Sequence, residues 1–242
     1  MILEDIDDIE RAEETYWWHL GRSAIVEEQL RHWLPEERSR RILNVGCGTG
    51  GLVPLFRRWG QVTNVDRSEH ALRRAQEKGA ENLLQADAAK LPFRDGSYDA
   101  VFALDVLEHL PDDAAALREW HRVLSAGGAL FLTAPAYQWL WSYHDERLQH
   151  YRRYRASSLH QLLNSCGYRV VGRTYAITLV FPVIVLVRLC ESIFRIRRSS
   201  SYLSVPPIVN RALIGLLKIE ARILSRVDFP FGTSVVIRAI RA

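Results

Sequence analysis

The chain carries the stretch Ile42-Leu43-Asn44-Val45-Gly46-Cys47-Gly48-Thr49-Gly50-Gly51-Leu52, in which an apolar run leads into closely spaced glycines. The apolar run predicts a buried strand, and we expect a helix to begin at Leu52. Glycines at a turn from strand to helix let the bare backbone approach a ligand, close to the helix end that binds anions. The stretch therefore predicts a ligand site at the end of a strand.

Apolar and amphipathic runs alternate along most of the chain after this stretch. We expect strands at residues 42–45, 62–65, 82–86, 98–104, 129–133, 168–177 and 234–240. Helices are expected from Ser68, from Asp112 to the pair Gly127-Gly128, and over residues 157–165. Strands that alternate with helices are typical of a parallel sheet, so the expected fold class is α/β.

The 242 residues are expected to form a single domain in four parts. Residues 1–38 form an N-terminal helical part, in which residues 8–34 have helical spacing and contain a dense aromatic cluster around Trp18. Residues 39–176 are the alternating core. Residues 177–230 form a helical insert, and residues 231–242 hold the final strand.

The net charge of +4 is unevenly distributed. Residues 1–146 hold 16 Lys/Arg and 25 Asp/Glu, whereas residues 147–242 hold 16 and 3. A basic C-terminal part favours an anionic partner, such as a membrane surface or a phosphorylated substrate, or solvated basic faces. The acidic N-terminus is unlike a signal peptide, and the three cysteines show no disulfide or zinc spacing. We expect a cytoplasmic protein, with peripheral association at the inner membrane surface as an extension of that expectation.

The insert combines an apolar run with a basic amphipathic helix. Residues 177–187 are apolar apart from Thr178, but a membrane span needs about twenty such residues. Arginines follow at positions 195, 197 and 198, and residues 208–227 predict a helix whose apolar stripe is broken only by Glu220. The pattern fits a helix pair that lies on an anionic bilayer or covers a lipid-like substrate. It equally fits a lid or a dimer contact.

The glycine turn alone leaves two kinds of cofactor open. Gly46, Gly48 and Gly51 match the G-x-G-x-x-G pattern of dinucleotide-binding proteins, and Asp66 follows 20 residues after Gly46, where a ribose hydroxyl would be held. An NAD(P)-dependent oxidoreductase is therefore an alternative at this point.

Two further segments favour a different cofactor. Gln85-Ala86-Asp87-Ala88 places a second acid at the end of the third strand, and residues 91–101, from Leu91-Pro92-Phe93 to Asp99-Ala100-Val101, lead into the fourth. With the glycine turn, these segments resemble the class I methyltransferases that use S-adenosylmethionine (SAM), of the small-molecule type 11/12, over about residues 40–176. The resemblance implies a Rossmann-like, mostly parallel sheet of seven strands whose last strand is antiparallel.

The resemblance also implies how SAM would be held. Gly46, Gly48 and Gly50 would lie beside its methionine part, and Asp66 would accept hydrogen bonds from its ribose hydroxyls. The adenine amino group would be read by Asp87, with the Ala88 amide nearby. Leu104 and Asp105 would lie beneath the sulfonium.

Acceptor residues are expected in the loops after the fourth and fifth strands, because ligands of open α/β sheets lie beyond the strand ends. Our candidate bases are His144 and His150, with His109 in reserve. The candidate substrate contacts are Trp18, Arg22, Tyr137, Asp145, Arg153 and Tyr154. The pattern Asp105-x-x-Glu108-His109 resembles the metal-binding pattern of some O-methyltransferases, with Asp in place of Glu at the first position; we assign no metal.

The function that these residues predict is methyl transfer from SAM to an oxygen or nitrogen of a small acceptor that is lipid-linked or anionic. Besides the oxidoreductase, the alternative is a SAM-binding or membrane-recruited module without turnover, which a histidine-rich loop collapsed over the crevice would favour. Nucleic acid is not an expected partner, because the sequence has no recognised RNA-binding module. The sequence assigns no oligomeric state.

Overall fold

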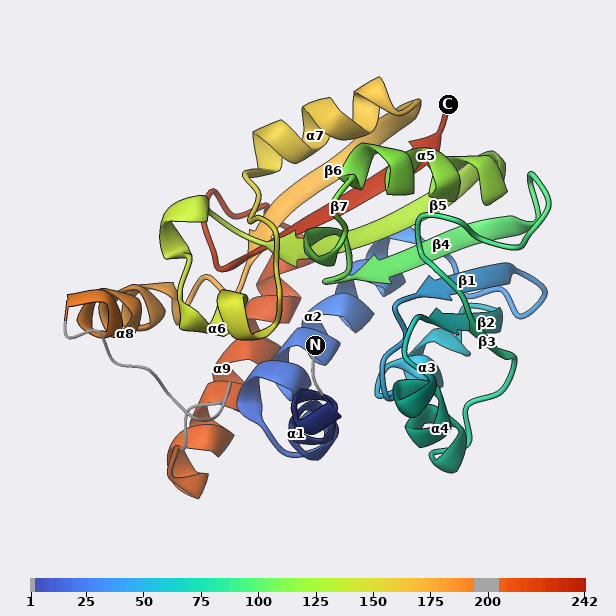
Figure 1. Ribbon diagram of the computed structural model, residues 1–242. Helices are drawn as coiled ribbons and strands as arrows, with labels where there is room; N and C mark the ends of the chain where they lie inside the picture. The colour runs from blue at the N-terminus through green and yellow to red at the C-terminus, as the bar shows by residue number, and fades with distance from the viewer. Residues whose placement is uncertain (1–2, 194–204) are drawn as a thin grey trace.

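The computed structural model describes residues 3–193 and 205–242, and its centre is one seven-stranded sheet (Figure 1). The strand order is β3-β2-β1-β4-β5-β7-β6. The neighbours from β3 to β5 pair in parallel, and β7 lies antiparallel between β5 and β6. The strands are β1 (Arg41–Val45), β2 (Gln61–Asp66), β3 (Leu83–Gln85), β4 (Tyr98–Leu104), β5 (Leu124–Pro135), β6 (Tyr168–Ala176) and β7 (Ser234–Arg241). The expected fold, with its antiparallel last strand, is confirmed.

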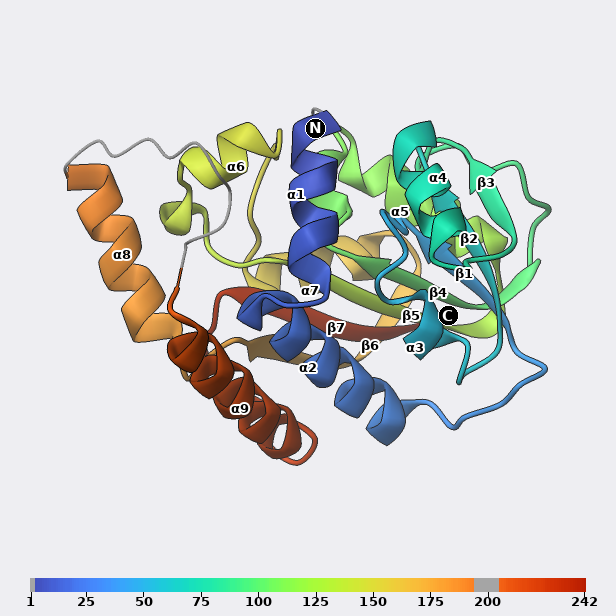
Figure 2. The same cartoon turned by 90° about the horizontal axis from the view of Figure 1, so that it is seen from below.

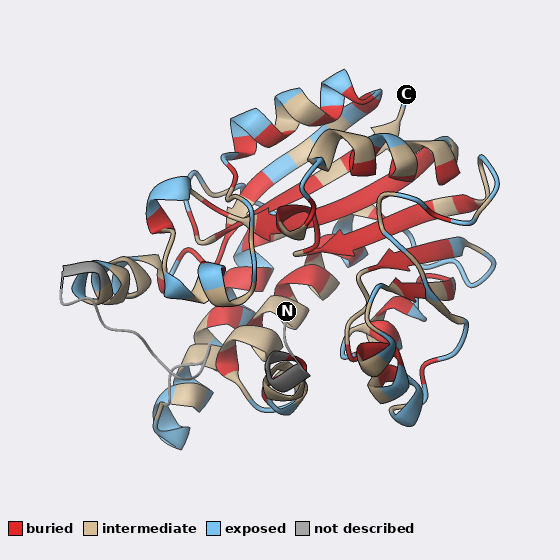
Figure 3. Ribbon diagram, viewed as in Figure 1, coloured by how far each residue is buried: buried red, intermediate tan, exposed pale blue. Residues whose placement is uncertain are grey.

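Helices cover both faces of the sheet, and the central strands β1, β4, β5 and β7 are buried along most of their length (Figure 3). One face packs against α5 (Asp113–Val123) and α7 (Ala156–Ser165), and Trp120 and Leu159 contribute to that core. The other face packs against α2 (Trp17–Trp33), α3 (Val53–Phe56) and α9 (Pro207–Leu224), and Phe102 and Phe131 lie in that second core. The helix α4 (Glu69–Glu77) packs beside β2 and β3.

The N-terminal part forms two helices, α1 (Leu3–Glu13) and α2, where the sequence pattern indicated one helical element. The helix α2 packs along α9, so the N-terminal part and the insert form one layer (Figure 2). Asn210 joins them, because its side chain accepts from the Trp17 amide at 2.9 Å and donates to the Thr15 carbonyl at 2.8 Å. Gln29 adds a buried hydrogen bond to the Leu224 carbonyl at 2.7 Å.

Two local expectations about helices differ from the structure. The helix α5 ends at Val123, so Gly127 and Gly128 lie within β5 and do not stop the helix. The helix expected from Leu52 is only the four-residue α3. The apolar run of the insert becomes helical at Phe181, in α8 (Phe181–Ile193), and no described helix is long and apolar enough to cross a bilayer. The arginines at 195, 197 and 198 lie outside the described residues.

Candidate active site

The glycine turn after β1 adopts the backbone that its sequence predicts. Gly46 and Gly48 have φ values of +67° and +55°, in the left-handed region that side chains disfavour. A Cβ on Gly46 would meet Val106 at 2.4 Å, so that position needs glycine for packing as well. A Cβ on Gly48 would meet no atom within 4 Å. Gly48 therefore borders open space, where a ligand can approach the backbone.

Asp66, at the end of β2, faces this turn. Its carboxylate accepts from the Gly48 amide at 2.9 Å and from the Ser68 amide at 2.8 Å. Burial raises the pKa of Asp66, although these backbone donors oppose the rise. Because a carboxylate offers about four acceptor sites, Asp66 keeps capacity for further hydroxyl donors.

The end of β3 supplies a second acid at the same edge of the sheet. Asp87 is exposed and accepts from the Ala89 amide at 2.8 Å. Ala88 is held by the Trp120 indole, which donates to its carbonyl at 2.9 Å. Both residues border a large cavity at this edge of the sheet.

At the end of β4, Asp105 is held by two groups from distant parts of the chain. The Arg22 guanidinium, on α2, lies 2.6 Å from its Oδ2, and the Thr133 hydroxyl donates to its Oδ1 at 3.0 Å. Arg22 also lies over the Trp18 ring, 5.3 Å from its centroid. The N-terminal part thus contributes directly to this edge of the sheet.

One cavity of about 2280 Å³ contains all of these positions. Cavities for single small ligands are about 300–1,000 Å³, so the volume leaves room for more than one molecule. The open backbone at Gly48, with an adjoining carboxylate that retains acceptor capacity, fits the ribose and methionine part of SAM. Of the residues expected to hold SAM, those that line the cavity are Gly46, Gly48, Asp66, Asp87, Ala88, Leu104 and Asp105. Gly50 does not line it, because it packs against Ala75 of α4, so its expected contact is replaced by a packing role.

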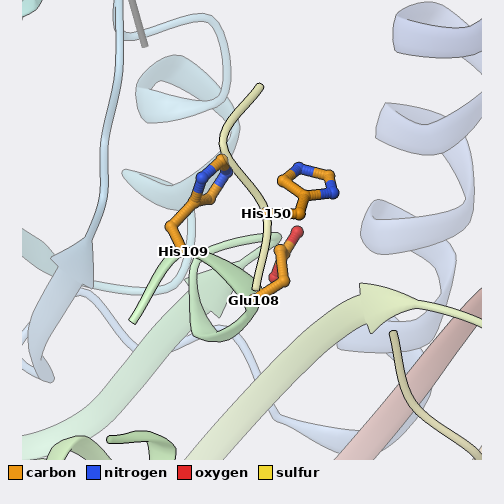
Figure 4. A group of neighbouring side chains, drawn as sticks. All are labelled: Glu108, His109 and His150. Atoms are coloured by element: carbon orange, nitrogen blue, oxygen red, sulfur yellow. The ribbon is translucent and has the colours of Figure 1, made fainter. Parts of the chain in front are cut away.

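Three residues that can bind a metal lie together in the cavity wall, after β4 and β5. The ligand atoms of Glu108, His109 and His150 all lie within 4.8 Å of one another (Figure 4). Glu108 is buried, with its Oε2 lacking a hydrogen-bond partner among the described residues. Burial, with the Asp105 charge nearby, raises the pKa of Glu108 well above its usual range. Carboxylate and imidazole ligands would suit a divalent transition metal here.

His150 is oriented by the buried carboxylate of Asp145. Its Nδ1 lies 2.9 Å from Asp145 Oδ1, while Arg153 donates to both oxygens of the same carboxylate at 2.7 and 3.0 Å. Burial works against ionisation, yet His150 and Arg153 hold the pKa of Asp145 well below its usual range. The hydrogen bond at Nδ1 leaves Nε2 of His150 as the second ring nitrogen available to a ligand.

The other two candidate bases are neutral over the physiological range. Burial lowers the pKa of His109 and of His144 to about 3 in each case, and a neighbouring side chain, His150 for His109 and Arg188 for His144, adds to the effect. Both side chains line the cavity, as His150 does. All three proposed bases therefore lie in one cavity, and two of them resist protonation.

Three expected substrate contacts lie outside the cavity lining. Tyr154 is buried and donates its hydroxyl to Asp113 at 3.0 Å, and Tyr137 stacks on Tyr175 with ring centroids 5.1 Å apart. Asp145 is completely buried beneath His150 and Arg153. These three act within the protein framework, which corrects their expected role. Trp18, Arg22 and Arg153 do line the cavity, although the guanidinium of Arg153 is engaged by Asp145.

The helix α1 contacts the glycine turn, and the sequence did not predict this contact. Glu13 accepts from the Thr49 hydroxyl of the glycine turn at 2.7 Å and from Lys78 at 2.9 Å. Asp7 and Glu10, on the same helix, face His70 and Arg74. The helix thus lies across the cofactor side through a row of ion pairs. Matching charge spacing in residues 7–13 and 70–78 was the available signal, but nothing in the sequence links two segments so far apart.

Comparison with known proteins agrees with this geometry. Residues 43–132 match the family described as methyltransferase domain. A ubiquinone biosynthesis O-methyltransferase of Xanthomonas oryzae pv. oryzae is 39% identical over 100 residues, which make up 38% of this chain and 42% of that protein. The chain thus matches less than half the length of that curated relative.

Solved structures share the fold over nearly the whole chain. A protein of Haloferax volcanii, solved in complex with the Trm112 methyltransferase activator, has a TM-score of 0.64 at 16% identity and covers 98% of this chain and 95% of its own. A SAM-dependent methyltransferase from Thermotoga maritima has a TM-score of 0.60 at 21% identity and covers 98% of both chains. At these identities the likeness concerns the fold alone.

Residues 43–132 match a methyltransferase domain, and the seven-stranded sheet has the class I methyltransferase fold. Its antiparallel β7, between β5 and β6, differs from the strand order of dinucleotide-binding domains, in which the sixth strand follows the fifth. Together with the family match, this strand order rules against the NAD(P)-dependent oxidoreductase considered from the glycine pattern.

Proposed function

We propose that this protein transfers a methyl group from SAM to an oxygen or nitrogen atom of a small acceptor. The observation that carries the proposal is the single cavity that joins the glycine turn, Asp66 and Asp105 to the histidines after β4 and β5. Donor and acceptor in one cavity can be aligned for direct transfer, which contributes much of the rate in such reactions. When bound, SAM supplies an electrophilic methyl group on a sulfonium.

The cavity wall that α8 and α9 form favours an acceptor with an apolar part. Ile184 and Val187 of α8 and Val209 and Leu213 of α9 line it, with Arg188 as a cation in the same wall. A lipid-linked or otherwise amphiphilic molecule with an anionic group suits such a wall. The matched relative is named as an O-methyltransferase of ubiquinone biosynthesis, which supports oxygen as the acceptor atom.

Within this reaction, we assign His150 as the general base and His144 and His109 as secondary candidates. The proton of the acceptor's hydroxyl or amine would pass to Nε2 of His150 as the oxygen or nitrogen bonds to the methyl carbon and the bond from that carbon to sulfur breaks, its electron pair remaining on sulfur. Asp145 would orient the ring and stabilise the imidazolium. The open cavity around His144 and His150 is unlike the collapsed loop that would favour a module without turnover.

Cofactor binding is tested by calorimetry with SAM, its demethylated product and NAD. We expect SAM and its product to bind and NAD not to bind. Asp66→Ala should weaken SAM binding by about 1.5–3 kcal/mol, the scale of a lost hydrogen bond to a charged group. Asp66→Asn keeps an acceptor for the Gly48 amide, so it controls for collapse of the turn, and Glu77→Gln, on an exposed pair of α4, serves as the matched surface control. Tight NAD binding without SAM binding would reverse the assignment.

Turnover is tested by mass spectrometry of products formed from cell extract and isotopically labelled SAM. Once the acceptor is known, His150→Ala should lower turnover by ~10²–10⁴-fold while SAM binding persists, because general-base catalysis contributes on that scale. His160→Ala, on α7 and outside the cavity lining, is the matched control. If a chelator abolishes turnover and a divalent ion restores it, Glu108, His109 and His150 form a metal centre and His150 is not the base.

A further inference from the structure

The outer side of the insert exposes large apolar side chains on two neighbouring helices. On α8, Leu186 is 62% exposed and Leu189 is 50% exposed, and neither lines the cavity. On α9, Ile208 is 73% exposed and Ile219 is 53% exposed. Both helices lie at the end of the molecule away from β1–β3 in two perpendicular views (Figures 1 and 2). Monomeric soluble proteins seldom gather so many large apolar side chains at one end of the molecule, so this surface indicates a binding partner.

The helix α8 cannot satisfy this surface by folding inward. Its opposite side already lines the cavity through Ile184 and Val187. The start of the helix is fixed by Glu220 of α9, which accepts from the Thr178 amide at 2.9 Å and the Leu179 amide at 2.8 Å. The helix therefore has an apolar side toward the cavity and a second apolar side toward the outside.

Charge distinguishes between the partners that could cover this surface. The exposed charged side chains of α9 are Arg211, Lys218 and Arg222, all basic, and the acid of this helix, Glu220, is buried. On α8, Arg188 and Glu191 pair with each other at 3.0 Å. A second copy of the chain in a two-fold dimer would place these basic side chains against each other, since such an interface uses the same surface twice.

We propose that the outer surface of α8 and α9, here called the insert surface, binds an anionic lipid bilayer at its interface. A bilayer offers an apolar layer beneath negative headgroups, which complements exposed Leu and Ile side chains set among Arg and Lys. The proposed attachment is peripheral, with the helices lying at the interface of the bilayer. The inference concerns a surface outside the cavity and does not depend on the chemistry inside it.

The test is flotation of the full chain with vesicles of phosphatidylcholine, with and without phosphatidylglycerol. We expect binding only to the vesicles that contain phosphatidylglycerol, and weaker binding as salt rises. Each basic residue near the surface raises the affinity about fivefold, so Lys218→Gln with Arg222→Gln should weaken binding about 30-fold. Leu186→Ser with Leu189→Ser should also weaken it.

The matched control removes the same charge elsewhere. Arg169 and Arg173 are exposed on β6, outside α8 and α9, and Arg169→Gln with Arg173→Gln should leave vesicle binding nearly unchanged. Thermal unfolding of each variant confirms that these exposed substitutions leave the fold intact. No binding to anionic vesicles at low salt would overturn the proposal. Equal loss in both pairs would overturn it too, because binding would then follow net charge alone, and self-association through the insert surface without vesicle binding would assign the surface to a second copy.

Discussion

Replacing Glu220 by alanine should lower the stability of the protein far more than a typical substitution on a helix. The side chain is completely buried between α9 and the turn that precedes α8. Its two oxygens accept from the amides of Thr178 and Leu179, at 2.8–2.9 Å. The alanine variant would leave both amides without these acceptors inside the protein.

The magnitude follows from those two donors. An unsatisfied buried donor costs about 1–3 kcal/mol, and hydrogen bonds to a charged acceptor are at the stronger end of the range. Because the two bonds share one carboxylate, we expect a combined loss of about 3 kcal/mol and not the full sum. For a chain of this size, that loss lowers the melting temperature by about 6–12 °C.

Urea denaturation of parent, Glu220→Ala and Glu220→Gln measures the effect. The glutamine variant keeps one acceptor oxygen and should lose about half as much as the alanine variant. Glu77→Ala removes an exposed acid on α4 and should stay within about 0.5 kcal/mol of the parent. If Glu220→Ala stays within that same range, the carboxylate does not anchor α8, and the reasoning about the insert is wrong.

Three further changes have expected outcomes. The free energy of unfolding should fall as pH drops from about 7.5 to 5.5, because the pKa of His144 is lowered to about 3 in the folded protein and the unfolded chain therefore takes up the proton first. The loss is about 1.4 kcal/mol per pH unit below 6.5 for each histidine with such a lowered pKa. Urea titrations of His144→Asn should show a smaller loss of stability over the same pH range. Lys78→Glu replaces the partner of Glu13 by a side chain that repels it. The Kd for SAM, measured by calorimetry, should therefore rise up to about fivefold at low salt and less at high salt. Gly48→Ala should fold, with a loss of about 1–2 kcal/mol in the free energy of unfolding because residue 48 has a left-handed backbone. The variant should bind SAM at least about tenfold more weakly. Unchanged SAM binding would mean that the open space beside Gly48 is not the cofactor site.

The parts of the fold that the sequence predicted are those with a local cause. The strand β4 has the expected bounds, because an apolar run there is bordered by a turn at each end. Asp112 was expected to open a helix, and its side chain caps α5 by accepting from the Ala115 amide at 2.8 Å. The left-handed glycines at 46 and 48 were likewise predictable, since closely spaced glycines directly after a strand favour a tight turn with positive φ. The backbone of the glycine turn could therefore be predicted from the sequence.

The acceptor side was less predictable because its contacts join distant segments. Tyr154 was expected to touch substrate, but the partner that removes it from the cavity, Asp113, lies 41 residues earlier. Position in a loop after β5 could not distinguish this tyrosine from His150, which does line the cavity. The break at Glu220 in an otherwise apolar stripe was visible in the sequence, yet its purpose required the position of residues 178 and 179.

Three long-range contacts indicate which parts of the chain affect SAM binding and which affect the choice of acceptor. Arg22 reaches Asp105 from the N-terminal part, Glu13 reaches the glycine turn from α1, and Glu220 fixes the insert that forms the apolar wall. The first two contacts join residues 1–38 to the core, and the third joins two parts of the insert. Substitutions in residues 177–230 should therefore alter the choice of acceptor while the affinity for SAM changes little. Substitutions at Glu13 and Arg22 should change SAM binding as well, because their partners lie in the glycine turn and at Asp105, where SAM is expected to bind.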